Sequence, residues 1–106
     1  MNADAVCLDA FCCWLCAHED EIVGCPASCY HSPLARWLSE CFHAVYGVDG
    51  MWFGRALYDY QCWRLLPRWA VLFSSALERV KAPSVTGLQA LAVLAYVELA
   101  LSSRAA

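Results

Sequence analysis

The sequence lacks basic residues where an export signal would need them. There is no lysine or arginine among residues 1–20, and Asp9 interrupts the apolar stretch in this segment. A secretory signal combines a basic segment with an uninterrupted apolar one, so residues 1–20 do not qualify. We therefore expect a cytoplasmic protein, in which glutathione and thioredoxin keep thiols reduced. The even count of eight cysteines consequently does not predict four disulfides.

Charged residues are scarce, at 16% of the chain, and the net charge is −3. A protein that binds nucleic acid through its phosphates normally carries a basic field, so we expect no nucleic-acid partner. The longest apolar segment, Val85–Leu101, contains Gln89 and Glu98. It also falls short of the roughly 20 apolar residues that cross a bilayer, so we expect no membrane span.

Recognisable signatures are absent as well. No stretch matches a nucleotide-binding, protease, kinase, DNA-reading or zinc-finger pattern, and we find no internal repeat, low-complexity tract or linker. A chain of 106 residues suits one hydrophobic core. We interpret residues 1–106 as a single domain.

Apolar residues, by contrast, are abundant. They make up 61% of the chain, including five tryptophans, five tyrosines and four phenylalanines. This content exceeds the roughly 45–50% of an ordinary globular chain and excludes disorder. A domain this small leaves much of its surface exposed, so part of the apolar material must face solvent. The composition therefore predicts an apolar docking surface for a second copy or another protein.

The spacing of apolar residues predicts an all-α fold, a single compact bundle of four to five helices. Ser32-Pro33 has the form of a helix start, with a capping hydroxyl followed by proline in the first turn. Thr86 and Gln89 have the spacing of a capping box at the start of the last helix. Because that helix is apolar almost all round, we expect it at the centre of the bundle or at a subunit interface. The expected helices cover residues 4–17, 33–46, 59–66, 67–81 and 86–102.

Residues 48–54 leave an alternative open. Asp49-Gly50 between apolar residues is also a two-residue hairpin signal, which would place a small hairpin around Val48–Gly54. The other interpretation is a turn that leads into a short helix capped by Asp59.

The cysteines suggest one candidate metal site. Cys13 and Cys16 form one closely spaced pair, Cys25 and Cys29 form another, and His31 follows two residues later. Tetrahedral zinc takes four such ligands, so these five residues are the candidate metal ligands and zinc is the one cofactor the sequence suggests. The other interpretation is that the cysteines act as small apolar packing residues.

A catalytic cysteine is a third hypothesis for these residues. A nucleophile at Cys25 or Cys29 would need His18, His31 or His43 as a base within hydrogen-bond reach, which spacing alone cannot show. A redox role for the Cys13 pair would need a thiol at the amino end of a helix, whereas this pair lies further along one. We therefore expect no enzymatic activity.

Tryptophan and arginine recur together in the middle of the chain. Arginine stacks favourably on aromatic rings, and both residue types dominate protein–protein hot spots. The sequence therefore predicts a small non-enzymatic interaction or regulatory protein that self-associates or binds a protein partner, with zinc binding as the alternative. The candidate partner-binding residues are Trp37, Trp52, Arg55, Trp63, Arg64 and Arg68, with the acidic residues Glu19, Asp20 and Glu21.

Overall fold

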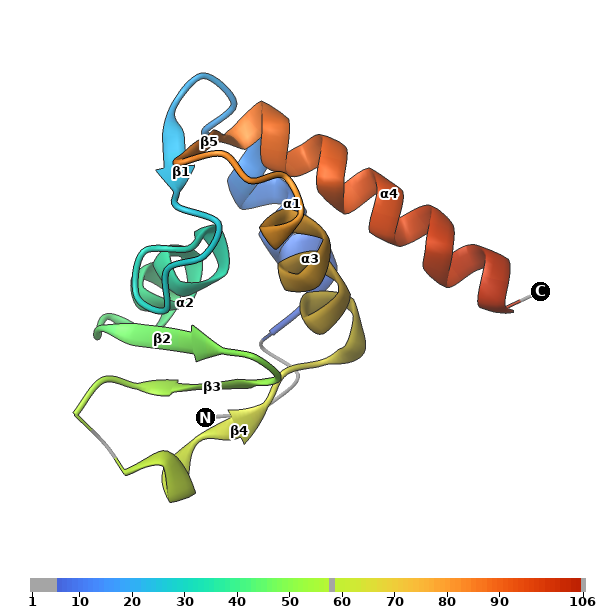
Figure 1. Ribbon diagram of the computed structural model, residues 1–106. Helices are drawn as coiled ribbons and strands as arrows, with labels where there is room; N and C mark the ends of the chain where they lie inside the picture. The colour runs from blue at the N-terminus through green and yellow to red at the C-terminus, as the bar shows by residue number, and fades with distance from the viewer. Residues whose placement is uncertain (1–5, 58, 106) are drawn as a thin grey trace.

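The computed structural model describes residues 6–57 and 59–105 (Figure 1). The described residues form an α+β fold with four α-helices and two antiparallel sheets. The prediction of an all-α helical bundle is therefore wrong. The helices are α1 (Leu8–Cys16), α2 (Pro33–Phe42), α3 (Arg68–Glu78) and α4 (Gly87–Ala105), with a short 3₁₀ helix, η2, at Tyr60–Cys62.

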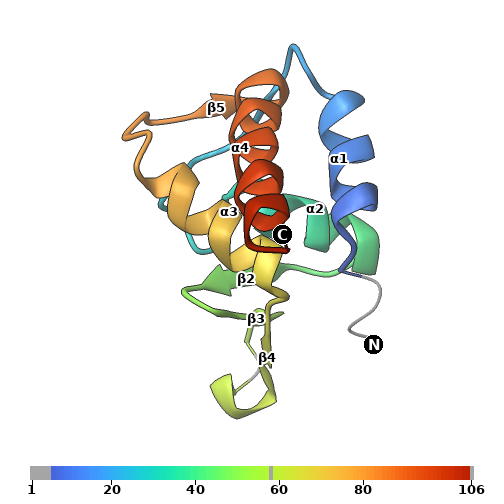
Figure 2. The ribbon, with the colours of Figure 1, turned by 90° about the vertical axis from the view of Figure 1, so that its right-hand side faces the viewer.

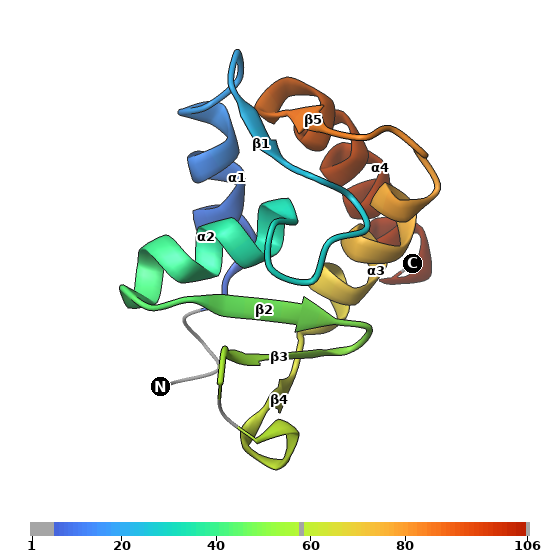
Figure 3. The ribbon, with the colours of Figure 1, turned by 60° about the vertical axis from the view of Figure 1, so that its left-hand side comes forward.

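The strands form two separate antiparallel sheets. One pairs β1 (Ile22–Gly24) with β5 (Val85–Thr86), and the other has the order β2 (Tyr46–Asp49), β3 (Trp52–Arg55), β4 (Arg64–Leu65). The sheets lie at opposite ends of the molecule, with the helices between them (Figure 1). Figure 3 shows the three strands of the larger sheet one below the other, beneath α2.

The larger sheet starts where the sequence predicts continued helix. Helix α2 ends at Phe42, because His43 adopts a left-handed conformation with φ of 54°. Strand β2 then pairs with β3 around Gly50, which has φ of 61°. The hairpin alternative around Val48–Gly54 is therefore the correct one, and the helix expected over residues 59–66 is reduced to η2 and β4.

Both predicted helix starts are confirmed. The Ser32 hydroxyl accepts a hydrogen bond from the Ala35 amide at 3.2 Å, at the start of α2. At the start of α4, the Thr86 amide donates to the Gln89 side chain at 2.9 Å and the Gln89 amide donates to the Thr86 hydroxyl at 3.2 Å. Local capping chemistry was thus readable from the sequence.

Aromatic rings fill the centre of the core. Phe11 of α1 is fully buried, and its ring centroid lies 5.1 Å from Trp37 of α2, 5.5 Å from Trp69 of α3 and 5.1 Å from Phe73 of α3. One side chain therefore joins three helices. Burial of this ring cluster stabilises the packing of α1 against α2 and α3.

Helix α4 is not central. It packs against α1 and α3 through Ala90, Leu94 and Val97, which are buried, whereas Leu88 and Leu99 on its other side are exposed. Its carboxyl-terminal part projects past the rest of the chain (Figure 1). Among the described helices, none combines the length and the apolar character that a membrane crossing requires.

Candidate functional site

One face of the larger sheet is buried at Val48 and Phe53, and the opposite face is partly exposed. Cross-strand partners share a face, and Val48 and Phe53, which pair with each other, are both buried. Trp52 of β3 and Leu65 of β4 form a pair on the opposite face. Their side chains are 46% and 55% exposed. This face therefore presents large apolar side chains to solvent.

Two glycines on the exposed face create room for aromatic rings. A Cβ atom on Gly47 would lie 2.7 Å from a Tyr30 ring carbon, and one on Gly54 would lie 2.3 Å from the Trp63 ring. The centroid of the Tyr60 ring lies 4.8 Å from the centroid of the Trp63 ring. We call this face the outer sheet surface, which consists of Tyr30, Trp52, Tyr60, Trp63 and Leu65.

A carboxylate lies within this surface. Asp49 pairs across the hairpin with Trp52 and so shares its face, and Asp49 is exposed. The negative charge of Asp49 is the largest cause that raises the pKa of the Tyr60 hydroxyl above its usual range, followed by burial and the charge of Tyr30. The outer sheet surface therefore combines exposed aromatic rings with local negative charge.

The structure separates the predicted partner-binding residues. Trp52 is exposed on the outer sheet surface, and Trp63 belongs to that surface although its ring is buried against Gly54. Trp37 is 2% exposed and lies in the core. Arg55 and Arg64 are exposed, but they share the other face of the sheet, and the exposed Arg68 begins α3.

The predicted acidic residues lie at the other end of the molecule. Glu19, Asp20 and Glu21 are exposed in the turn that follows α1. The backbone carbonyls of Glu19 and Glu21 accept hydrogen bonds from the first amides of α4, at 3.1 and 3.0 Å. This turn is next to the β1–β5 sheet (Figure 1), so it does not border the outer sheet surface.

Sequence reasoning missed Tyr30, Tyr60 and Leu65. The signal for Leu65 was its two-residue spacing from Trp63, which puts both on one strand face. The signal for the tyrosines was indirect, because glycine inside a strand often marks the close approach of another group.

The candidate zinc ligands do not converge. Cys13 and Cys16 are exposed on α1, Cys25 and His31 are exposed in the loop before α2, and Cys29 is half-buried against Gly47. Within residues 6–57 and 59–105, no group of three or more His, Cys, Asp or Glu side chains is placed to hold a metal ion. All eight cysteines are free thiols.

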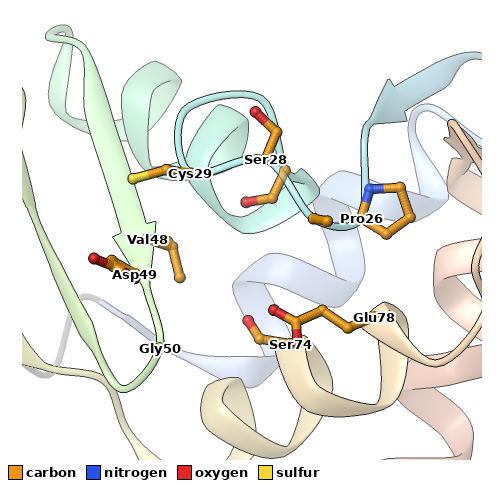
Figure 4. Close-up of a pocket in the computed structure, with 10 residues that line it drawn as sticks. Pro26, Ser28, Cys29, Val48, Asp49, Gly50, Ser74 and Glu78 are labelled. Atoms are coloured by element: carbon orange, nitrogen blue, oxygen red, sulfur yellow. The ribbon is translucent and has the colours of Figure 1, made fainter.

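A small pocket of about 100 Å³ lies between the loop before α2, strand β2 and helix α3 (Figure 4). Burial raises the pKa of the Cys29 thiol there, and the charge of Asp49 raises it further. A cysteine nucleophile needs the opposite shift and a nearby base, and the lining contains no histidine. The lining residues are Pro26, Ala27, Ser28, Cys29, Ser32, Val48, Asp49, Gly50, Ser74 and Glu78.

Comparison with known proteins identifies no relative. No family model, no curated protein and no solved structure matches the chain. Inference about function therefore depends on the chain's own surfaces.

Proposed function

We propose that this protein is a non-enzymatic interaction protein that docks a protein partner on the outer sheet surface. The observation that carries the proposal is the exposed Trp52–Leu65 pair, 46% and 55% accessible, beside the Tyr60 ring, which is 61% accessible. Tryptophan and tyrosine bury large areas with little loss of conformational freedom, and they dominate binding hot spots. A sheet face with such exposed side chains suits a protein surface better than a small molecule, which needs a concave site.

The charge of this surface indicates the partner's chemistry. Asp49 lies on the same face as Trp52, and Asp59 is exposed beside η2. Negative groups around an apolar centre complement an apolar patch flanked by lysine or arginine. We therefore infer a partner with that pattern at this surface.

A site-specific photocrosslinker tests this proposal. We expect a benzophenone side chain at Leu65, introduced in cells that naturally make the protein, to give one discrete protein adduct. A benzophenone at the exposed Ala17, which caps the carboxyl end of α1, is the matched control and should not give this adduct. Trp52→Ala in the Leu65-labelled protein should remove the adduct, while far-UV circular dichroism and the unfolding midpoint stay unchanged. Equal labelling from both positions would contradict the proposal.

The cysteines support a reducing compartment, and we place the protein in the cytoplasm on this basis. Cys7, Cys13, Cys16, Cys25 and Cys62 are all exposed free thiols. Exposed thiols persist where glutathione and thioredoxin keep them reduced. Alkylation of intact cells followed by mass spectrometry should find these thiols unpaired, and disulfides among them would contradict the placement.

A further inference from the structure

Helix α4 carries a second apolar surface, separate from the outer sheet surface. Leu88, Tyr96 and Leu99 are 58%, 67% and 70% exposed, and the exposed Ala92 and Ala95 lie between them. In Figure 2 this helix faces the viewer, and no other described element lies in front of it. We call this surface the α4 strip, which consists of Leu88, Ala92, Ala95, Tyr96 and Leu99.

The residue spacing of the α4 strip is that of a helix–helix seam. Leu88, Ala92, Ala95 and Leu99 are separated by four, three and four residues, the spacing at which side chains from two helices interlock. These four side chains are large, small, small and large, and the order is the same from either end of the helix. Alanines at the middle let two backbones approach closely, and leucines at the ends close over the contact. The strip is thus complementary to itself.

The charges near the strip do not oppose a second copy at this position. Glu98 is the one charged side chain among the exposed positions from Leu88 to Ser102. It lies toward α1, where its charge helps to raise the pKa of Cys12. A solvent-facing helix side normally carries charges, and two molecules of net charge −3 repel one another. Contact through an uncharged strip keeps like charges out of the interface.

We infer that the α4 strip pairs with the same strip of a second copy in a two-fold symmetric dimer. Beside the strip, Ala76 of α3, Arg79 at the carboxyl end of α3 and Val93 of α4 help to line a shallow groove that reaches Tyr96. This groove lets the contact extend onto α3. The inference does not depend on the outer sheet surface, because the two surfaces share no residue.

The small size of the strip indicates weak association. From Leu88 to Leu99 the strip is about 17 Å long, and at a helix width of about 10 Å it offers roughly 170 Å² of projected area. A standard interface buries about 800 Å² on each partner, so even with the groove this contact belongs to the small class. We therefore expect a dissociation constant in the micromolar range.

Sedimentation velocity over a concentration series from about 1 to 300 μM tests the inference. The wild-type protein should change from monomer to dimer across this range. Leu99→Glu places a charge within the strip and should weaken association at least tenfold. Val45→Glu is the matched control, because Val45 is 60% exposed on another part of the molecule, and it should dimerise like the wild type.

Three outcomes would overturn the inference. These are a wild-type protein that stays monomeric to 300 μM, a Leu99→Glu variant that dimerises unchanged, and equal losses from both variants. Circular dichroism and the unfolding midpoint confirm that each variant is folded. Flotation with phosphatidylcholine vesicles adds a further check, since a monomeric wild type that floats with lipid would assign the strip to a membrane surface instead.

Discussion

The indole ring of Trp63 lies so close to Gly54 that a methyl group on this glycine would come within 2.3 Å of the ring. Gly54 is on β3, and Trp63 immediately precedes β4. The contact therefore helps to fix the position of β4 beside β3 in the sheet. The outer sheet surface therefore depends on a glycine that contributes no side chain to it.

We expect Gly54→Ala to destabilise the protein by about 1–3 kcal/mol, the usual cost of overpacking a close contact. The methyl group must displace either the buried indole or the backbone of β3. Urea unfolding measures the change. Gly50→Asn is the control, because that position has φ of 61° and open space around it, and asparagine tolerates left-handed angles. A Gly54→Ala variant as stable as the wild type would disprove the packing.

Removal of the Phe11 ring should cost about 3–5 kcal/mol, since Phe11→Ala leaves a cavity among rings from α2 and α3. A loss of this size approaches the entire stability of many small domains. The free energy of unfolding in urea provides the measurement. Val45→Ala, at an exposed site, should leave it almost unchanged. Comparable effects from the two variants would show that Phe11 does not join the helices.

Thr86→Ala should destabilise the protein by about 0.5–2 kcal/mol, because the Gln89 amide at the start of α4 loses its acceptor. Gln89→Glu keeps an acceptor for the Thr86 amide and places negative charge at the helix amino end, so its stability should equal or exceed that of the wild type. Thermal unfolding compares the two variants. A loss in Gln89→Glu as large as that in Thr86→Ala would contradict the capping box.

The raised pKa of Cys29 predicts a pH dependence. The folded state holds the thiol proton more tightly than the unfolded state, whose pKa is near 9.0. Below that pH both states are protonated and the full stabilisation is present, whereas above it stability falls as the unfolded state loses protons first. Urea unfolding from pH 7 to 10 should show this decline.

Asp49→Asn tests the cause, because removal of the neighbouring charge should lower the pKa of Cys29. In this variant iodoacetamide should label Cys29 faster at pH 8, as followed by mass spectrometry. Exposed Cys62 serves as the internal reference and should keep its rate. An unchanged rate of Cys29 labelling in the Asp49→Asn variant would show that Asp49 does not affect the pKa of the thiol.

A metal chelator distinguishes cysteines that only pack from cysteines that bind zinc. Because Cys13 and Cys25 are exposed and the candidate ligands do not converge, we expect Cys13→Ser and Cys25→Ser each to change stability by less than about 0.5 kcal/mol. Freshly purified, reduced protein should unfold identically with and without EDTA. Stoichiometric zinc by elemental analysis, together with unfolding on chelation, would revive the zinc hypothesis.

The sequence revealed the features that act within a few residues. Ser32 before Pro33, and Thr86 three residues before Gln89, supply capping groups whose partners are one turn away, so their structure follows from local chemistry. The sequence also shows directly that α4 carries few charged residues. These parts of the fold could be predicted because no distant residue decides them.

Tertiary contacts decided the larger sheet and both exposed surfaces. Strands of two to four residues carry too little alternation to compete with helical spacing, so Tyr46–Asp49 became β2 only through pairing with β3. Likewise, which side of α4 meets α1 and α3 depends on the fit of Ala90 and Leu94 against helices distant in the chain. Composition alone determined that apolar side chains must remain outside, because a chain of 106 residues has too little interior for them. Only packing decided that Trp52, Leu65, Tyr96 and Leu99 are among the exposed ones.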